Sequence, residues 1–157
     1  MRVGIGYDSH KFVSGRPLIL GGQTIPFDQG LAGHSDADAV AHALTDAILG
    51  AAAAGNIGSL FPDSDSQWKG ADSLALLRAA YQKVEALGYT FHQADITVIM
   101  ERPKLGPHTA AMAQALAHEL GAEAAAVSIK AKTNEGMGFI GRGEGVAVMA
   151  VATLERR

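Results

Sequence analysis

The sequence contains no cysteine. Disulfide bonds and thiolate-bound metals are therefore excluded, and any metal ion must be held by histidine and carboxylate side chains. No apolar run reaches the roughly 18 residues that a membrane-spanning helix needs, so we expect no membrane partner. The opening segment MRVGIGYDSH also lacks the long apolar stretch of a secretory signal. Together these absences favour a cytoplasmic protein.

Neither sign of charge dominates. The chain has 13 basic and 16 acidic residues, a formal net charge of −3, and its lysines and arginines are scattered. This balance predicts neither a nucleic-acid-binding face nor an anionic membrane surface, so any phosphate recognition must be local. The 157 residues, 48% of them apolar, are typical of a single globular domain, residues 1–157, with a substantial core.

Apolar patterns and turn residues divide the chain into strands and helices. Residues 35–54 favour a helix with Ser35 as its N-cap and with Asp36 and Asp38 in its first turn, where they oppose the helix dipole. Further helices are expected over residues 73–87 and 107–120, each followed by a glycine. Strands are expected over residues 2–8, 94–100, 126–133 and 145–154, and residues 16–27 favour a hairpin.

These elements do not alternate regularly along the chain. Such an order favours an α+β fold, in which a mixed β-sheet carries helices packed on one face. The other face of the sheet then has no cover within the chain. Because the subunit is small, we expect it to bury that face by self-association.

Asp8 and His10 are two metal-capable side chains in the first predicted strand. Residues two apart in a strand project from the same face, so both could reach one ion. His42 lies on the first predicted helix and offers a third ligand. Two imidazoles and one carboxylate are typical of catalytic zinc. Spacing alone leaves the alternative open that all three are ordinary surface or packing residues.

Three further segments could bind an anion. The run GHSDAD places His34 and Ser35 at a helix start, where unpaired backbone N–H groups suit a phosphate. Residues 56–65 form a long polar loop between helices. Residues 130–145 combine glycines with basic and acidic side chains but lack the spacing of a P-loop. Each segment is equally readable as an ordinary cap or connection.

Seven segments in order resemble one family, 2-C-methyl-D-erythritol 2,4-cyclodiphosphate synthase of the non-mevalonate isoprenoid pathway. They are GYDSH, PLILGG, GHSDAD, HALTDAILGAAAAGNIGSLFPDSD, KGADS, PKLGPH and KTNEGMGFIGRGEGVA. The resemblance implies a homotrimer with active sites between subunits. It implies conversion of 4-diphosphocytidyl-2-C-methyl-D-erythritol 2-phosphate into the 2,4-cyclodiphosphate and CMP, by attack of the substrate's own 2-phosphate on its β-phosphate.

The resemblance also assigns roles to individual residues. It implies zinc ligands at Asp8, His10 and His42, a second divalent ion (Mg²⁺ or Mn²⁺) at Glu135, and transition-state stabilisation by His34 and Thr133. It implies a bound isoprenoid diphosphate in an axial cavity near Arg142 and Glu144. The implied substrate contacts are Asp8, Ser9, His10, His34, Ser35, Asn56, Ile57, Gly58, Phe61, Pro62, Asp63, Ser64, Asp65, Met100, Glu101, Arg102, Pro103, Lys104, Leu105, Gly106, Ala131, Lys132, Thr133, Asn134, Glu135, Phe139 and Arg142.

Three positions depart from the family's usual residues. Asn56 replaces an aspartate, which removes a charge from the loop expected to cradle the methylerythritol. Ala37 replaces a glycine, and in the first turn of a helix we expect this to have little effect. Lys132 stands where small polar residues are usual and would alter contacts with the cytidine. A non-catalytic trimer that binds isoprenoid diphosphates is the alternative function.

Overall fold

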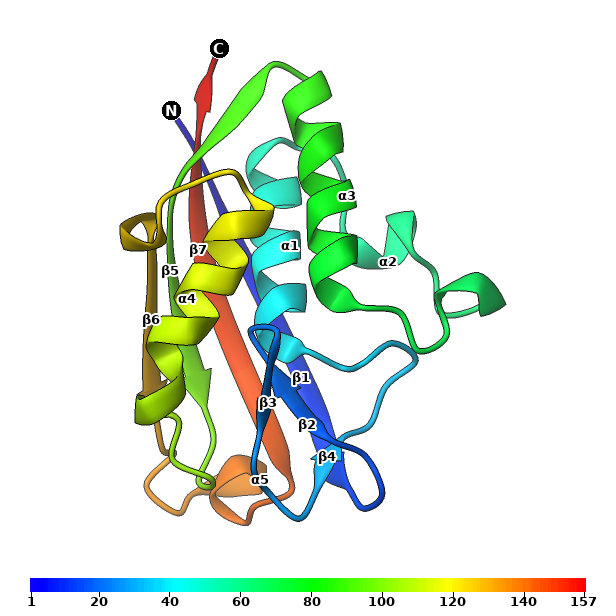
Figure 1. Ribbon diagram of the computed structural model, residues 1–157, viewed down its shortest axis with the longest axis vertical. Helices are drawn as coiled ribbons and strands as arrows, with labels where there is room; N and C mark the ends of the chain where they lie inside the picture. The colour runs from blue at the N-terminus through cyan, green and yellow to red at the C-terminus, as the bar shows by residue number, and fades with distance from the viewer.

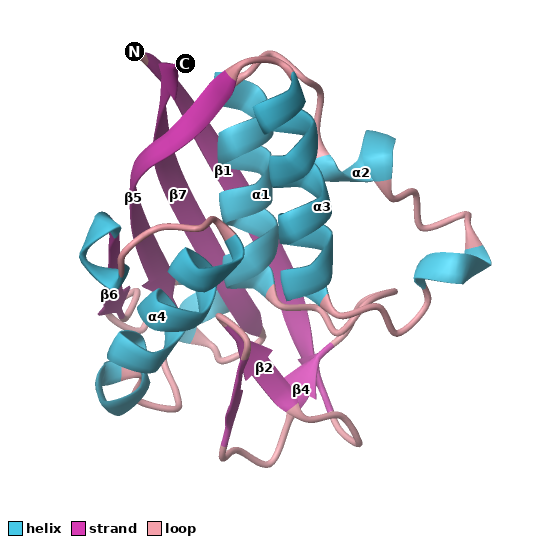
Figure 2. Ribbon diagram, turned by 45° about the horizontal axis from the view of Figure 1, so that its top comes forward, coloured by secondary structure: helices cyan, strands magenta, loops and turns pink.

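The computed structural model describes residues 1–157, and its centre is a five-stranded mixed sheet, whose arrangement can be followed in Figures 1 and 2. The strand order is β4 (Gly30–Leu31), β1 (Arg2–Val13), β7 (Gly145–Arg156), β5 (Tyr89–Ile99) and β6 (Val127–Lys132). Only the β5–β6 pair is parallel. Helices α1 (Ala39–Ala51), α3 (Ser73–Ala86) and α4 (Thr109–Glu119) all cover one face. The α+β class predicted from the sequence is confirmed. None of the helices is both long and apolar enough to cross a membrane.

Helix α1 lies unusually close to strand β1. A β-carbon built on Gly4 would stand 2.1 Å from the carbonyl oxygen of Ala47, and one built on Gly6 would stand 1.8 Å from that of Ala43. Glycine in the strand and alanine in the helix therefore let the two backbones touch. Asp8 follows on the same face of β1, so its side chain meets the N-terminal part of α1.

The start of α1 differs from the prediction. The N-cap is Asp38, whose side chain accepts a hydrogen bond from the Ala41 amide, so the predicted cap Ser35 lies before the helix. No acidic residue lies in the first turn. The reason is the backbone of Ala37, which has a φ of 59°, in the left-handed region that a helix cannot include. The expectation that Ala37 is an ordinary helical residue is therefore also wrong, because glycine would adopt this conformation more readily.

Several short elements escaped the sequence patterns. The predicted loop 56–65 contains the helix α2 (Ile57–Leu60), capped by Asn56, and a 3-10 helix follows at Ser66–Trp68. The glycine-rich stretch contains α5 (Gly138–Gly141). Strand β1 continues past the predicted end to Val13, and β5 begins earlier, at Tyr89. The predicted hairpin is present as β2 (Leu18–Leu20) and β3 (Gln23–Ile25), with left-handed glycines at the turn.

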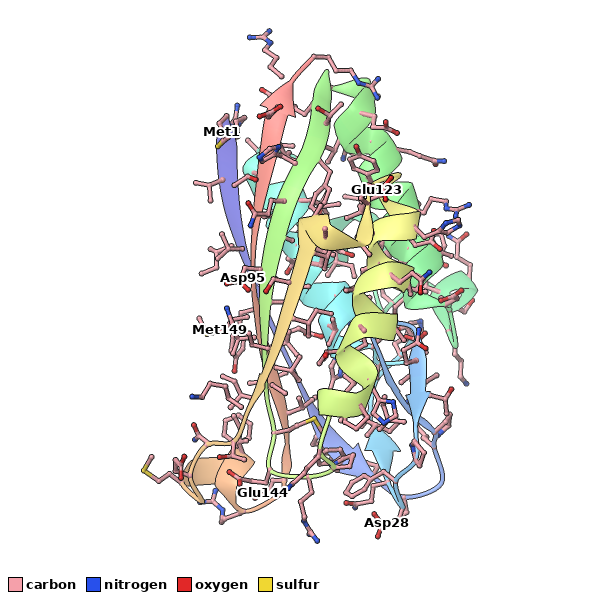
Figure 3. All side chains as sticks on the ribbon, turned by 60° about the vertical axis from the view of Figure 1, so that its left-hand side comes forward. Met1, Asp28, Asp95, Glu123, Glu144 and Met149 are labelled. Atoms are coloured by element: carbon pink, nitrogen blue, oxygen red, sulfur yellow. The ribbon has the colours of Figure 1, made fainter.

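The face of the sheet opposite the helices is open and partly apolar (Figure 3). Met1 and Met149, labelled in the figure, project from this side. Its β1 and β7 side chains include Val3, Ile5 and Val151, which are 68%, 66% and 42% exposed. Because monomeric proteins rarely expose a continuous apolar patch of this kind, the open face has the character of a contact surface.

Candidate metal and phosphate site

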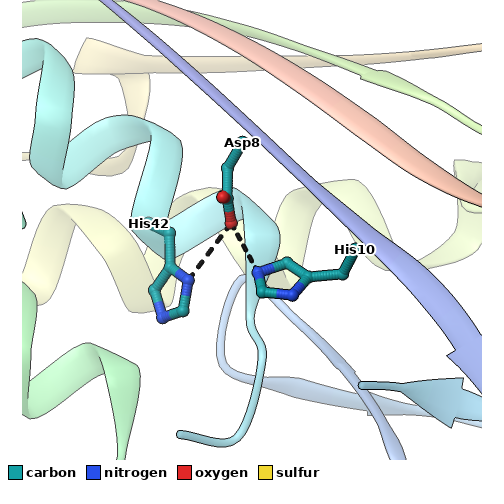
Figure 4. A group of neighbouring side chains, drawn as sticks. All are labelled: Asp8, His10 and His42. Carbon is teal, nitrogen blue, oxygen red and sulfur yellow. Dashed lines mark hydrogen bonds and ion pairs between the residues drawn. The ribbon is translucent and has the colours of Figure 1, made fainter. Parts of the chain in front are cut away.

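Asp8, His10 and His42 converge on one point between β1 and α1 (Figure 4). The Oδ2 atom of Asp8 lies 2.7 Å from Nε2 of His10 and 3.1 Å from Nδ1 of His42. One ligand atom from each residue lies within 4.8 Å of the others. The side chains are 25%, 17% and 12% exposed, so the group is partly shielded yet reachable. The structure thus brings together the three residues that spacing alone left uncertain.

The electrostatics of this group favour charge on its members. Burial raises the pKa of Asp8, but its hydrogen bonds with His10 and His42 outweigh burial and hold the pKa below its ordinary value of 3.8. Burial lowers the pKa of His10, but the bond to Asp8 outweighs it and holds the pKa above 6.5. The carboxylate therefore attracts positive charge to this point, which a cation would supply.

The donor set fits a divalent metal. In each imidazole, the ring nitrogen that faces the centre of the group has only Asp8 as a partner. The other ring nitrogen is hydrogen-bonded outside the group: His10 Nδ1 to the Ala32 carbonyl and His42 Nε2 to Ser73 Oγ, each at 2.7 Å. Outer bonds of this kind orient metal-binding histidines in proteins. Two imidazoles and one carboxylate with an open side suit zinc, which binds a fourth ligand from outside the protein.

A cavity of about 470 Å³ opens beside this group. His34 and Ser35 stand at its edge, and His34 Nε2 is bonded to the Asp65 carbonyl at 3.1 Å, which ties the two walls together. Of the predicted loop contacts, Ile57, Gly58, Phe61, Pro62 and Asp63 line the cavity. Asn56, Ser64 and Asp65 are not among its lining residues. Asn56 instead caps α2, accepting from the Ser59 amide at 2.8 Å.

The residues expected around cytidine form a different cavity of about 360 Å³. No residue lines both cavities. Glu101 also holds the neighbouring loop, because its Oε1 accepts from the amides of Asn134 at 2.8 Å and Gly136 at 3.3 Å. The residues lining this second cavity are Met100, Glu101, Pro103, Lys104, Leu105, Gly106, Thr109, Ile129, Ala131, Lys132 and Thr133. Arg102 is not among them.

Three predicted residues belong neither to the metal-ligating group nor to the lining of the first cavity. Glu135 is exposed, has a left-handed φ of 52° and is not part of the group within this chain. Phe139 lines a third cavity, of about 230 Å³, which Ser9 and His10 also line. Arg142 is exposed and forms an ion pair with Glu144 at 2.8 Å. The single chain therefore does not assemble all the predicted site residues in one place.

Sequence reasoning missed five residues of the site, of which Gly33 and Leu76 only line the first cavity. Trp68 lines the first cavity and packs edge-on against Phe61, with ring centroids 5.0 Å apart. Ser73 bonds His42, and Asp36 bonds Ser73. The segments KGADS and GHSDAD contain the last two, but serine and aspartate there are equally typical of helix starts, so only tertiary contact reveals their role.

The model of the YgbB family matches residues 1–155 of this chain. The chain belongs to the YgbB family. Among its relatives, the 2-C-methyl-D-erythritol 2,4-cyclodiphosphate synthase of Salinibacter ruber is 56% identical over 155 residues, which are 99% of each chain.

Solved structures of YgbB relatives share the fold. A 2C-methyl-D-erythritol-2,4-cyclodiphosphate synthase in a CDP-bound form has a TM-score of 0.89 and 42% identity, over 98% of this chain and 100% of that one. The bifunctional IspDF from Campylobacter jejuni has a TM-score of 0.96 and 45% identity. The match covers 99% of this chain but 42% of that longer protein.

Proposed function

We propose that this protein converts 4-diphosphocytidyl-2-C-methyl-D-erythritol 2-phosphate into 2-C-methyl-D-erythritol 2,4-cyclodiphosphate and CMP. An oxygen of the 2-phosphate forms a bond to the β-phosphorus. The bond from that phosphorus to the oxygen bridging to the α-phosphorus breaks, and CMP leaves with this oxygen. The convergence of Asp8, His10 and His42 beside a cavity of about 470 Å³ carries the proposal, in a chain 56% identical to a synthase of this name.

The reaction needs no protein nucleophile, so the protein's task is to position the substrate and to stabilise its charge. His34 and Ser35 stand beside the metal ligands and contact phosphate oxygens in this proposal. The segment from Asn56 to Asp65 holds the methylerythritol part. Thr133 stabilises the transition state from the second cavity, which binds the cytidine.

The metal ligands are assigned by their donor chemistry. Asp8, His10 and His42 would hold Zn²⁺, and Glu135 would hold a second divalent ion, Mg²⁺ or Mn²⁺. When bound, these ions neutralise charge on the diphosphate oxygens and act as Lewis acids. The protein's own contribution is to hold two inward nitrogens and one carboxylate oxygen ready, within 4.8 Å of one another.

The active site is completed in a homotrimer. Two observations support this assembly: the metal-ligating group and the cytidine cavity share no lining residue, and one face of the sheet is open and partly apolar. A neighbouring subunit then supplies the cytidine cavity, together with Glu135. Arg142 and Glu144 border the trimer axis, where an isoprenoid diphosphate binds. Because the substrate is a charged nucleotide derivative, we place the reaction in the cytoplasm.

The activity is tested with purified protein, zinc, Mg²⁺ or Mn²⁺, and the named substrate. We expect release of CMP and, by ³¹P NMR, the two coupled phosphorus signals of a cyclic diphosphate. Binding of isoprenoid diphosphates without any CMP release, in protein loaded with both metals, would refute the synthase and favour the non-catalytic binder.

The metal assignment is tested by removing a ligand. We expect His42→Ala to lower zinc affinity at least 100-fold, because one of three protein ligands is lost, and to abolish turnover, while the metal-free protein stays folded. His92→Ala is the matched control, since His92 is about half exposed and lies outside the group. Zinc content by atomic emission, beside a circular-dichroism melt, separates loss of metal from loss of fold. Equal zinc content in both variants would disprove the assignment.

A further inference from the structure

We propose that Ser73 and Asp36 form a hydrogen-bonded relay that fixes the tautomer and orientation of His42, which makes both of them positioning residues of the metal site. The inference rests on the proposed metal site and adds to it two residues with no assigned role. The relay runs from the imidazole of His42 on α1, through the hydroxyl of Ser73 at the start of α3, to the carboxylate of Asp36.

The direction of each hydrogen bond follows from the groups involved. The Ser73 hydroxyl is fully buried and donates its single hydrogen to Oδ1 of Asp36, because an ionised carboxylate can only accept. Ser73 Oγ can then only accept from Nε2 of His42, which lies 2.7 Å away. The proton of the neutral imidazole is thereby held on Nε2. Nδ1 faces Asp8 at 3.1 Å, and its lone pair would bind a metal that displaced the proton shared with Asp8.

Asp36 is itself held firmly in place. Its Oδ1 accepts from the amide of Asp38, and its Oδ2 accepts from the amide of Ser73, each at 3.1 Å. Its own amide donates to the Ala71 carbonyl at 3.1 Å. The carboxylate therefore joins the segment before α1 to the start of α3, and the relay transmits that fixed position to His42.

The two histidines of the site are oriented by different means. His10 donates from Nδ1 to the backbone carbonyl of Ala32 at 2.7 Å, so its Nε2 faces inward. His42 faces inward with Nδ1, and side chains rather than backbone decide this. Ser35 Oγ lies 3.1 Å from the same His42 nitrogen and can partly replace Ser73. Outer-shell bonds of this kind contribute about 10- to 100-fold to metal affinity.

The test measures zinc binding rather than turnover. We expect Ser73→Ala to weaken zinc binding about tenfold in competition with a chromophoric chelator, and Ser35→Ala/Ser73→Ala to weaken it further, towards 100-fold. In Ser73→Ala the backbone amide at position 73 can still bond Asp36, and Asp36 keeps its bond from Asp38, so the fold is supported. Thr45→Val is the matched control, because Thr45 is also fully buried on α1 but its hydroxyl bonds only the Ala41 carbonyl.

A second readout reports the tautomer directly. In the zinc-loaded wild type, long-range ¹H–¹⁵N NMR should show His42 protonated at Nε2, and the double serine variant should show that proton exchanging faster with water. Zinc affinity within twofold of wild type in the double variant, or a proton on His42 Nδ1, would overturn the relay. Zinc binding by the wild type without CMP release would instead refute the proposed reaction and leave the relay standing.

Discussion

At the scale of single residues, two aspartates near the site have opposite surroundings. Asp8 faces two imidazoles, which hold its pKa low despite burial. Asp38 is fully buried and faces only backbone amides, those of Gly21, Gly22 and Ala41 at 2.7–3.0 Å. Burial raises the pKa of Asp38 to about 6, the charge of Asp36 adds to the rise, and the three amide bonds only partly oppose it. Asp38 is thus a structural cap rather than a site residue.

The raised pKa of Asp38 makes stability depend on pH. The folded pKa of about 6 lies above the ordinary value of 3.8, so the folded chain binds more protons between these values, and the free energy of unfolding falls as pH rises through this window. At about 1.4 kcal/mol per pH unit, Asp38 lowers stability by about 3 kcal/mol between pH 4 and pH 7. We expect Asp38→Asn to remove this slope in urea denaturation.

The difference in the free energy of unfolding between wild type and Asp38→Asn isolates the titration of this carboxyl group, because every other titratable group is present in both proteins. The variant should also be less stable at pH 7 in absolute terms. The side-chain nitrogen introduced at position 38 would face the backbone N–H of Gly22 or Gly21. Because both groups are hydrogen-bond donors, that backbone N–H would be left without a partner. A constant difference in stability from pH 4 to pH 7 would show that Asp38 does not titrate as described.

At the scale of elements, the contact between β1 and α1 decides whether the site exists, because β1 carries Asp8 and α1 carries His42. We expect Gly6→Ala to destabilise the protein by about 3 kcal/mol or more, since the added methyl would lie 1.8 Å from a backbone oxygen of α1. Gly50→Ala is the control. A β-carbon there has no neighbour nearer than 3.9 Å, and alanine favours the helix by about 1 kcal/mol. Chemical denaturation of both variants measures the contrast, and a stable Gly6→Ala protein would contradict it.

Local patterns predicted those elements whose signals are long. The helix following Asp72 and the final strand needed only periodicity and flanking turn residues, and both are present. The helices α2 and α5 have four residues each, too few for a repeating pattern. The wrong cap at α1 has a different cause. Ser35 is a suitable cap in isolation, but the left-handed backbone of Ala37 prevents a helix from beginning there. The amides of the hairpin turn bond the Asp38 side chain, and the N-cap is therefore Asp38, three residues later.

At the scale of the whole molecule, the site depends on contacts between segments distant in sequence. The D-x-H spacing put Asp8 and His10 on one strand face, but only the packing of α1 on β1 supplies His42. The relay through Ser73 needs α3 beside α1, which no local pattern encodes. The residues expected around cytidine line a separate cavity that shares no residue with the first, so the two parts of the predicted site do not meet within one chain.

We expect the open face of the sheet to be a contact between subunits. Ile5 is 66% exposed and lies directly opposite Val151 in the strand register, so both belong to the surface that the trimer would bury. A buried, unpaired carboxylate is costly. We therefore expect Ile5→Glu to dissociate a trimer of three 16.2 kDa chains into monomers, as measured by light scattering, and to abolish CMP release. Leu87→Glu is the matched control, because Leu87 is 52% exposed at the end of α3 on the helical side. It should stay trimeric and active. A wild-type monomer that releases CMP would disprove the shared site, because each chain would then be complete by itself.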